Sequence, residues 1–140
     1  MGMELKDKKE KNCEVKHKPR GIHRFINSFK YSFDGLKYAY TNEQSLTIHI
    51  IFSVIVLVTG LIFEITEMQW ALVLFAMALI IVAELLNTAI EATVDMVTEE
   101  FHPLAKVAKD CASAAVFIAS LVATGMWCYV FIPKIICLIF

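Results

Sequence analysis

The chain has 140 residues, of which 58% are hydrophobic and 19% are charged, with a formal net charge of −1. Its mean hydropathy is +0.62. Soluble domains are about half apolar and about a quarter charged, so this composition excludes an ordinary soluble domain and predicts a membrane protein. The charge is unevenly placed, because residues 1–40 hold ten of the thirteen Lys and Arg residues but only five of the fourteen acids.

Residues 1–20 are polar, rich in charge and nearly free of aliphatic side chains, which predicts a disordered basic cytoplasmic tail. No short apolar core ending in a cleavage site follows them, so we expect no removable signal peptide. The remainder, residues 21–140, is expected to form one membrane domain. The cysteines form no CxxC pair and have no His at metal spacing, which favours reduced thiols at Cys13, Cys111, Cys128 and Cys137.

Residues 22–41 have a single apolar face. Their large apolar side chains recur at steps of three and four residues, as on one side of a helix, at Ile22, Phe25, Ile26, Phe29, Phe33, Leu36 and Tyr40. Cationic side chains such as Arg24 and Lys30 point elsewhere. This pattern predicts an amphipathic helix that lies flat in the membrane surface.

Three apolar segments follow, at residues 46–63, 70–97 and 111–132. At a rise of about 1.5 Å per residue, each is long enough to cross a hydrocarbon core of about 30 Å. Most Lys and Arg residues precede the first segment, and Lys106 and Lys109 fall in the second connection. Because positive charge marks cytoplasmic loops, we expect a cytoplasmic N-terminus and an external C-terminus.

The second segment carries a polar stripe in the stretch ELLNTAIEATVD, residues 84–95. Its polar groups lie within about 100° of one another on a helix: Glu84, Asn87, Thr88, Glu91 and Asp95. An acid in the middle of a span costs about 3 kcal/mol, so the stripe must face protein or water. Three helices enclose little interior, and we therefore expect an oligomer. The third segment offers a strip of small residues for close helix contact, at Ala112, Ala115, Ala119 and Ala123.

Glu84 and Glu91 are expected at different depths. Counted from Trp70, Glu84 lies about 21 Å along the helix and Glu91 about 31 Å. Glu84, inside the hydrocarbon, suits a general base that takes a proton from a lipid hydroxyl, whereas Glu91, at the wet boundary, suits a divalent ion that arrives with nucleotide phosphates. Lys109 and Asp110 follow on the same membrane face and suit phosphate chemistry.

Two alternatives give the stripe other roles. It could be interhelical hydrogen-bond glue in a passive bundle, or the charge relay of a non-enzymatic proton or ion pathway subunit. The cationic and acidic residues on the cytoplasmic side, Arg24, Lys109 and Asp110, favour phosphate chemistry, because a simple proton path does not need them. No glycine-rich phosphate loop is present, so a nucleotide site would rely on side chains and metal.

Two stretches resemble the small integral-membrane lipid kinases of bacteria, the family of diacylglycerol kinase and undecaprenol kinase. AELLNTAIEATVD followed by AKVAKDCASAAV is similar to the family patterns E-[IL]-[LV]-N-[ST]-A-I-E-x-x-V-D and A-K-D-x-x-[SA]-[AG]-A-V. GLKYAYTNE ends at Glu43, where the family carries its other metal-binding glutamate. The resemblance covers about residues 21–132.

The resemblance implies an all-α homotrimeric bundle in the bacterial cell membrane, with active sites shared between subunits, ATP and a lipid alcohol as partners, and no nucleic acid. Glu84 would be the catalytic base, and Glu43 and Glu91 would hold Mg²⁺. The residues around the nucleotide would be Arg24, Tyr31, Glu43, Glu91, Glu100, His102, Lys109 and Asp110. Asn87, Asp95 and Ser113 would support the site or the lipid.

The acceptor lipid is a choice between undecaprenol, giving undecaprenyl phosphate, and diacylglycerol, giving phosphatidic acid. The long basic leader, NEQSLTIHI at the first span and the ending FIPKIICLIF look more like the Gram-positive branch, which acts chiefly on undecaprenol. Two positions depart from the family pattern: Cys111 replaces a usual Met, and Phe101 replaces a common Tyr, which removes a hydroxyl that could contact nucleotide.

Overall fold

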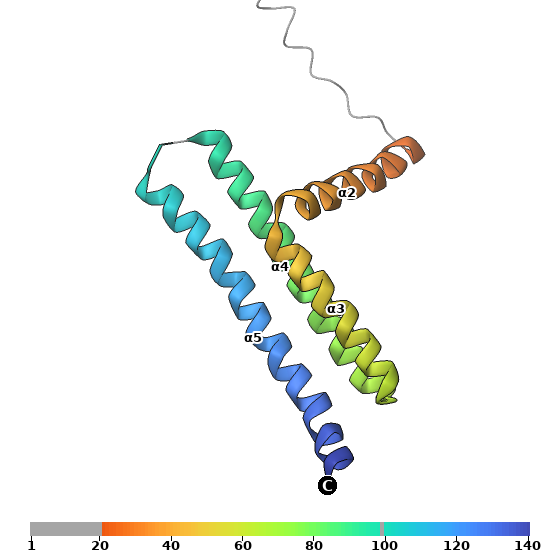
Figure 1. Cartoon of the computed structure of the whole chain (residues 1–140). Coiled ribbons are helices and arrows are strands. Elements are labelled where there is room, and N and C mark those ends of the chain that lie inside the picture. Colours follow the sequence, from red (N-terminus) through yellow and green to blue (C-terminus); the bar gives the residue numbers. More distant parts are fainter. Residues whose placement is uncertain (1–20, 99) are drawn as a thin grey trace, which may run out of the picture. The chain divides into compact units, whose positions relative to one another are not determined.

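The structure, a computed structural model, describes residues 21–98 and 100–140. These residues form four helices and no strand (Figure 1): α2 (Ile22–Asn42), α3 (Gln44–Ile62), α4 (Glu67–Val97) and α5 (Pro103–Ile139). The predicted all-α class is confirmed. The tail predicted at residues 1–20 lies outside the described residues.

The described residues divide into two compact units, at residues 21–35 and at residues 36–98 with 100–140. The boundary falls within α2, and each unit is described by itself. In the described part of the first unit, α2 exposes the apolar residues Ile22, Phe25, Phe29 and Phe33, and the rings of Phe25 and Phe29 meet edge to face at 5.0 Å. The helix and its unpartnered apolar face agree with the amphipathic pattern.

In the second unit, α3, α4 and α5 are each long and apolar enough to cross a membrane, so the chain is a multi-pass membrane protein. The predicted segments lie almost wholly within these helices. The largest difference is at α5, which begins at Pro103 rather than near residue 111 and continues to Ile139. Lys106 and Lys109, expected in a connection, therefore lie on a helix.

The start of α5 is set by local capping. His102 is the N-cap residue, and its side chain accepts a hydrogen bond from the Leu104 N–H at 3.3 Å. Pro103 occupies the first helical position, where the N–H that proline lacks would have no partner within the helix. These two residues begin the helix in a polar segment, about two turns before the apolar run.

The turn between α3 and α4 is held by short-range contacts. Glu64 has a positive φ of 46°, a conformation that non-glycine residues adopt rarely. Thr66 then caps α4: its side chain accepts from Gln69 N, and the Gln69 side chain accepts from Thr66 N at 3.0 Å. This reciprocal capping box satisfies two N–H groups at the helix end. It fixes the point at which the chain turns back.

Gly60 lies at a close contact between α3 and α4. A Cβ atom at this position would lie 2.7 Å from Cη2 of Trp70, so only glycine allows the indole to lie against the α3 backbone. From α5, Lys134 donates a hydrogen bond to the Phe63 carbonyl at 3.0 Å. The residue that ends α3 is therefore stabilised by the last helix of the chain.

The central helix is α4, which packs against both α3 and α5 and has the most buried apolar segment of the three. Of the predicted small-residue strip on α5, Ala112 and Ala119 are buried and Ala123 is half-buried, whereas Ala115 is exposed. A core near the α3–α4 turn contains Ile65, Val73 and Phe131. The central position of α4 places its polar stripe among the helices of the second unit.

Candidate active site

Glu84 is sealed within the second unit, with a side chain that is 2% exposed. Two residues of α3 approach it, one at each carboxyl oxygen. Ser45 Oγ donates a hydrogen bond to Oε2 at 3.0 Å, and His49 Nε2 lies 3.1 Å from Oε1. Ser45 and His49 are one turn apart and so lie on one face of α3, which allows them to bracket the carboxyl group.

The two oxygens of Glu84 differ in how they are satisfied. Oε2 accepts the hydroxyl of Ser45, whereas Oε1 is buried and has no hydrogen-bond partner, although His49 Nε2 lies 3.1 Å from it. Buried polar groups in native proteins nearly always have a partner. The open lone pairs of Oε1 can therefore accept a proton from a hydroxyl that enters the site.

Asn87 lies next to Glu84 along the buried part of the stripe. Its Nδ2 donates a hydrogen bond to Oε1 of Glu91 at 3.0 Å, while its own Oδ1 is buried without a partner. Thr88 is satisfied within α4, where its hydroxyl donates to the Glu84 carbonyl at 3.0 Å. Asn87 thus orients Glu91 and leaves an additional oxygen acceptor beside it.

Glu43 immediately precedes α3, at its N-cap position. Burial raises the pKa of its carboxyl group, and the negative charges of Glu91 and Glu84 raise that pKa further. The three predicted carboxylates, from α4 and from the start of α3, therefore share one electrostatic neighbourhood. Within residues 21–98 and 100–140, no three His, Cys, Asp or Glu side chains are arranged to hold a metal ion by themselves.

Charged pairs lie at the end of the polar stripe. Lys109 Nζ on α5 is 2.6 Å from Asp95 Oδ1 on α4, and Lys106 pairs with Asp110 along α5. All four side chains are more than a third exposed. The stripe therefore changes along α4 from the buried carboxyl of Glu84 to the exposed carboxyl of Asp95.

The remaining predicted site residues are placed separately. Arg24 and Tyr31 are exposed on the part of α2 that belongs to the first unit. Glu100 is exposed in the α4–α5 connection, His102 caps α5, and Ser113 is exposed on α5. Cys111, Cys128 and Cys137 are free thiols, while Cys13 lies outside the described residues.

The sequence analysis did not select Ser45 and His49 as site residues. Their only signal is the spacing of two polar side chains, four residues apart, in the otherwise apolar stretch SLTIHI at the start of α3. Such a pair indicates a polar face, but its partner on α4 becomes visible only once α3 and α4 are packed together.

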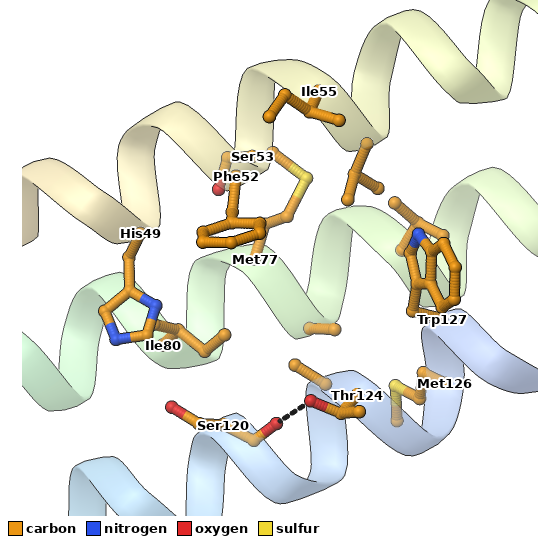
Figure 2. A pocket seen from close by; sticks show the side chains of 14 residues that line it. His49, Phe52, Ser53, Ile55, Met77, Ile80, Ser120, Thr124, Met126 and Trp127 are labelled. Atoms are coloured by element: carbon orange, nitrogen blue, oxygen red, sulfur yellow. Dashed lines mark hydrogen bonds between the residues drawn. The ribbon is translucent and has the colours of Figure 1, made fainter.

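An apolar groove of about 470 Å³ lies beside this site. Residues of α3, α4 and α5 line it, including Phe52, Val73, Met77 and Ala123, and Figure 2 shows His49 at one end and Trp127 at the other. Its few polar side chains include Thr124, whose hydroxyl bonds to the Ser120 carbonyl at 2.8 Å and so is already satisfied. The groove can hold a hydrocarbon chain. His49, which lines one end of the groove, also contacts Glu84.

The site combines a buried carboxylate beside an apolar groove with further carboxylates that lead along α4 to exposed ion pairs. In a multi-pass membrane chain, this arrangement defines a membrane enzyme that acts on a lipid. Comparison with known proteins gives the particular family: residues 30–131 match the model of prokaryotic diacylglycerol kinase. The chain belongs to this family and is a membrane lipid kinase, so the expectation of an enzyme is confirmed.

Curated relatives carry two names. Undecaprenol kinase of Bacillus subtilis is 33% identical over 114 residues, which cover 81% of this chain and 93% of the relative. Diacylglycerol kinase of Pseudomonas aeruginosa is 37% identical over 107 residues, covering 76% and 87% of the two chains. Diacylglycerol kinase of Helicobacter pylori is 38% identical over 114 residues, covering 81% and 89%. Identity is similar among the three, so it does not by itself select the lipid.

Proposed function

We propose that this lipid kinase transfers the γ-phosphate of ATP to the hydroxyl group of undecaprenol, giving undecaprenyl phosphate. The observation that carries the proposal is Glu84 Oε1, a buried acceptor without a hydrogen-bond partner, next to the His49 end of an apolar groove. The Bacillus relative, named undecaprenol kinase and covered over 93% of its length, supports the choice of lipid, as does the long basic leader.

In the proposed reaction, the lipid hydroxyl donates its proton to Glu84 Oε1 while its oxygen attacks the γ-phosphorus. The bond from that phosphorus to the β-phosphate oxygen breaks, and ADP leaves. Ser45 holds Oε2 and so keeps Oε1 directed at the substrate. General bases placed in this way typically contribute about 10²–10⁴-fold to a rate.

The residues around Glu91 fit Mg²⁺, which takes oxygen ligands and is commonly held by one or two carboxylates together with substrate phosphates. Burial and then the negative charge of Glu91 raise the pKa of Glu43, and a cation between these two carboxylates would relieve their repulsion. Bound Mg²⁺ would neutralise charge on the transferring phosphate.

We further propose that the nucleotide binds on the cytoplasmic face, close to Lys109, Asp110, Glu100 and His102, with Arg24 and Tyr31 contributing from α2. The predominance of Lys and Arg before the first span supports a cytoplasmic N-terminus and an external C-terminus in the bacterial cell membrane. The exposed ends of the polar stripe support a homotrimer with shared sites, in which neighbouring subunits cover them.

The direct test gives the purified protein in lipid vesicles labelled ATP, Mg²⁺ and undecaprenol. We expect label in the lipid phosphate, and its absence would overturn the proposal. Glu84→Gln keeps the shape of the side chain but removes the base, so we expect turnover to fall at least a hundredfold with nucleotide binding retained. A fully active Glu84→Gln variant would show that the base is another group.

Diacylglycerol is the second candidate acceptor, because the Pseudomonas and Helicobacter relatives are named diacylglycerol kinase. Undecaprenol and diacylglycerol should be offered together at equal mole fraction, with both products separated by chromatography. An excess of labelled undecaprenyl phosphate supports the proposed acceptor, and an excess of labelled phosphatidic acid replaces it with diacylglycerol.

A further inference from the structure

His49 is the one titratable side chain among the residues that line the groove. It also reaches Glu84, with 3.1 Å between Nε2 and Oε1. Figure 2 shows its ring at the groove end, where α3 faces α4. No part of the proposed transfer step uses this imidazole, although it lies between the space for the lipid and the base.

The transfer step leaves a proton on Glu84, and Glu84 has almost no contact with solvent. Its side chain is 2% exposed, whereas the His49 side chain is 22% exposed. Ser45, the other neighbour of the carboxyl group, already donates its hydroxyl proton to Oε2. The imidazole in contact with Oε1 is therefore the more exposed group to which Glu84 can pass its proton.

We propose that His49 is a positioning and proton-relay residue, which receives from Glu84 the proton of the acceptor hydroxyl and returns it to solvent. This inference rests on the proposed role of Glu84 as the base. After transfer, the Oε1–H bond breaks and an Nε2–H bond forms, giving an imidazolium beside a carboxylate. Imidazole is ordinarily more basic than a carboxylate, so the proton moves in the favourable direction. Loss of that proton to water restores both groups.

The residues around His49 and Glu84 favour an imidazolium beside a carboxylate. From α4, Glu84 faces the imidazole directly and Glu91 lies further along the helix; Glu43 lies before α3. Glu84, which contacts the imidazole, stabilises a transient imidazolium directly. From α5, the groove receives Ser120 and Thr124 and no titratable side chain. The imidazole thus faces a carboxylate from α4, and the α5 residues that line the groove include no cation.

The first test compares wild type with His49→Gln in the full-length protein, in lipid vesicles with saturating Mg²⁺. Glutamine retains an N–H donor but cannot titrate near neutrality. We expect kcat to fall roughly tenfold or more, less than the loss typical of a group that takes the proton itself, with KM values for ATP and lipid nearly unchanged. A merely structural role would raise KM or lower thermal stability instead.

The pH profile supplies the second measurement. The relay needs a neutral imidazole, so kcat of the wild type should fall as the pH is lowered and the imidazole takes up a proton. That part of the decline should be missing in His49→Gln. His23→Gln, which removes an exposed histidine on α2, is the matched control and should keep the wild-type profile. Ser45→Ala should slow turnover but retain the histidine-dependent decline.

Rescue of His49→Ala by added imidazoles provides a third measurement. We expect imidazole to restore part of kcat, and more basic derivatives of similar size to restore more. Wild-type kcat and pH profile in His49→Gln, or rescue that is independent of basicity, would overturn the relay. The outcomes separate the two proposals. An active Glu84→Gln variant would show that Glu84 is not the base. An inactive Glu84→Gln variant together with an unaffected His49→Gln variant would rule out only the relay.

Discussion

At the scale of single residues, the site is a set of carboxyl groups held at graded exposure. Glu84 is sealed and has one oxygen bonded by Ser45, Glu91 is half-buried and oriented by Asn87, and Asp95 is exposed in an ion pair with Lys109. Since each carboxyl has a different partner, substitutions should separate their roles.

Glu43→Gln should stabilise the protein while impairing its function. Burial and the charges of Glu91 and Glu84 raise the pKa of Glu43, so the folded state disfavours its charged form and loses stability as pH rises through its titration. Removing the charge should raise the midpoint of thermal unfolding by a few degrees at neutral pH in a chelator. Mg²⁺ should then stabilise wild type more than the variant, and equal stabilisation would contradict Glu43 as a ligand.

Asn87→Ala should weaken the use of Mg²⁺ without removing the base. The variant deletes the donor to Glu91 Oε1, and hydrogen bonds to charged groups contribute about 1.5–3 kcal/mol. The Mg²⁺ concentration needed for half of the maximal activity should therefore rise roughly tenfold or more. Thr93→Ala is the control, because its hydroxyl bonds only to the Ala89 carbonyl on the exposed side of α4; an equal effect of both variants would contradict the prediction.

At the scale of helices, the stability of the fold depends on the packing of α3 against α4 beside the turn that joins them. Gly60→Ala should destabilise the protein, because its Cβ atom would lie 2.7 Å from the Trp70 ring, and overpacking of this kind costs about 1–3 kcal/mol. Gly125→Ala is the matched control in α5, since nothing lies within 4 Å of the added atom. Thermal unfolding in detergent micelles should show a lower midpoint for Gly60→Ala alone.

The helices also show which structural features the sequence patterns can predict. Length and apolarity predict the three spans, because a bilayer imposes its thickness on any helix that crosses it. They place the start of α5 near residue 111, since the apolar run begins there, whereas His102 and Pro103 start the helix about two turns earlier. A cap acts through backbone N–H groups, and its signal is local rather than hydrophobic.

The site was predictable only in part, for a related reason. Helical spacing places Glu84, Asn87 and Glu91 on one face of α4 from sequence alone, because all three belong to one helix. Ser45 and His49 meet Glu84 through the packing of α3 on α4, and no periodicity within one segment specifies a contact between two. The likeness to a known family indicated the acids but not these two neighbours.

At the scale of the whole molecule, the second unit leaves much apolar surface and the end of the polar stripe exposed, including Asp95 and Glu100. We predict that three chains associate and cover part of this surface. Mass measurement of the protein in mild detergent should give a particle of three chains. A single-chain particle that retains full activity would contradict both the trimer and the shared sites.

The hydrogen bond from Lys134 to the Phe63 carbonyl has a consequence for biosynthesis. The two residues are 71 positions apart, so a ribosome completes the α3–α4 hairpin well before it makes the lysine. Until then the carbonyl at the end of α3 lacks the partner that Lys134 supplies. Backbone acceptors in a membrane need such a partner. Insertion of α5 therefore also completes the hairpin made before it, and a chain that stops short of Lys134 would leave the end of α3 without this hydrogen bond.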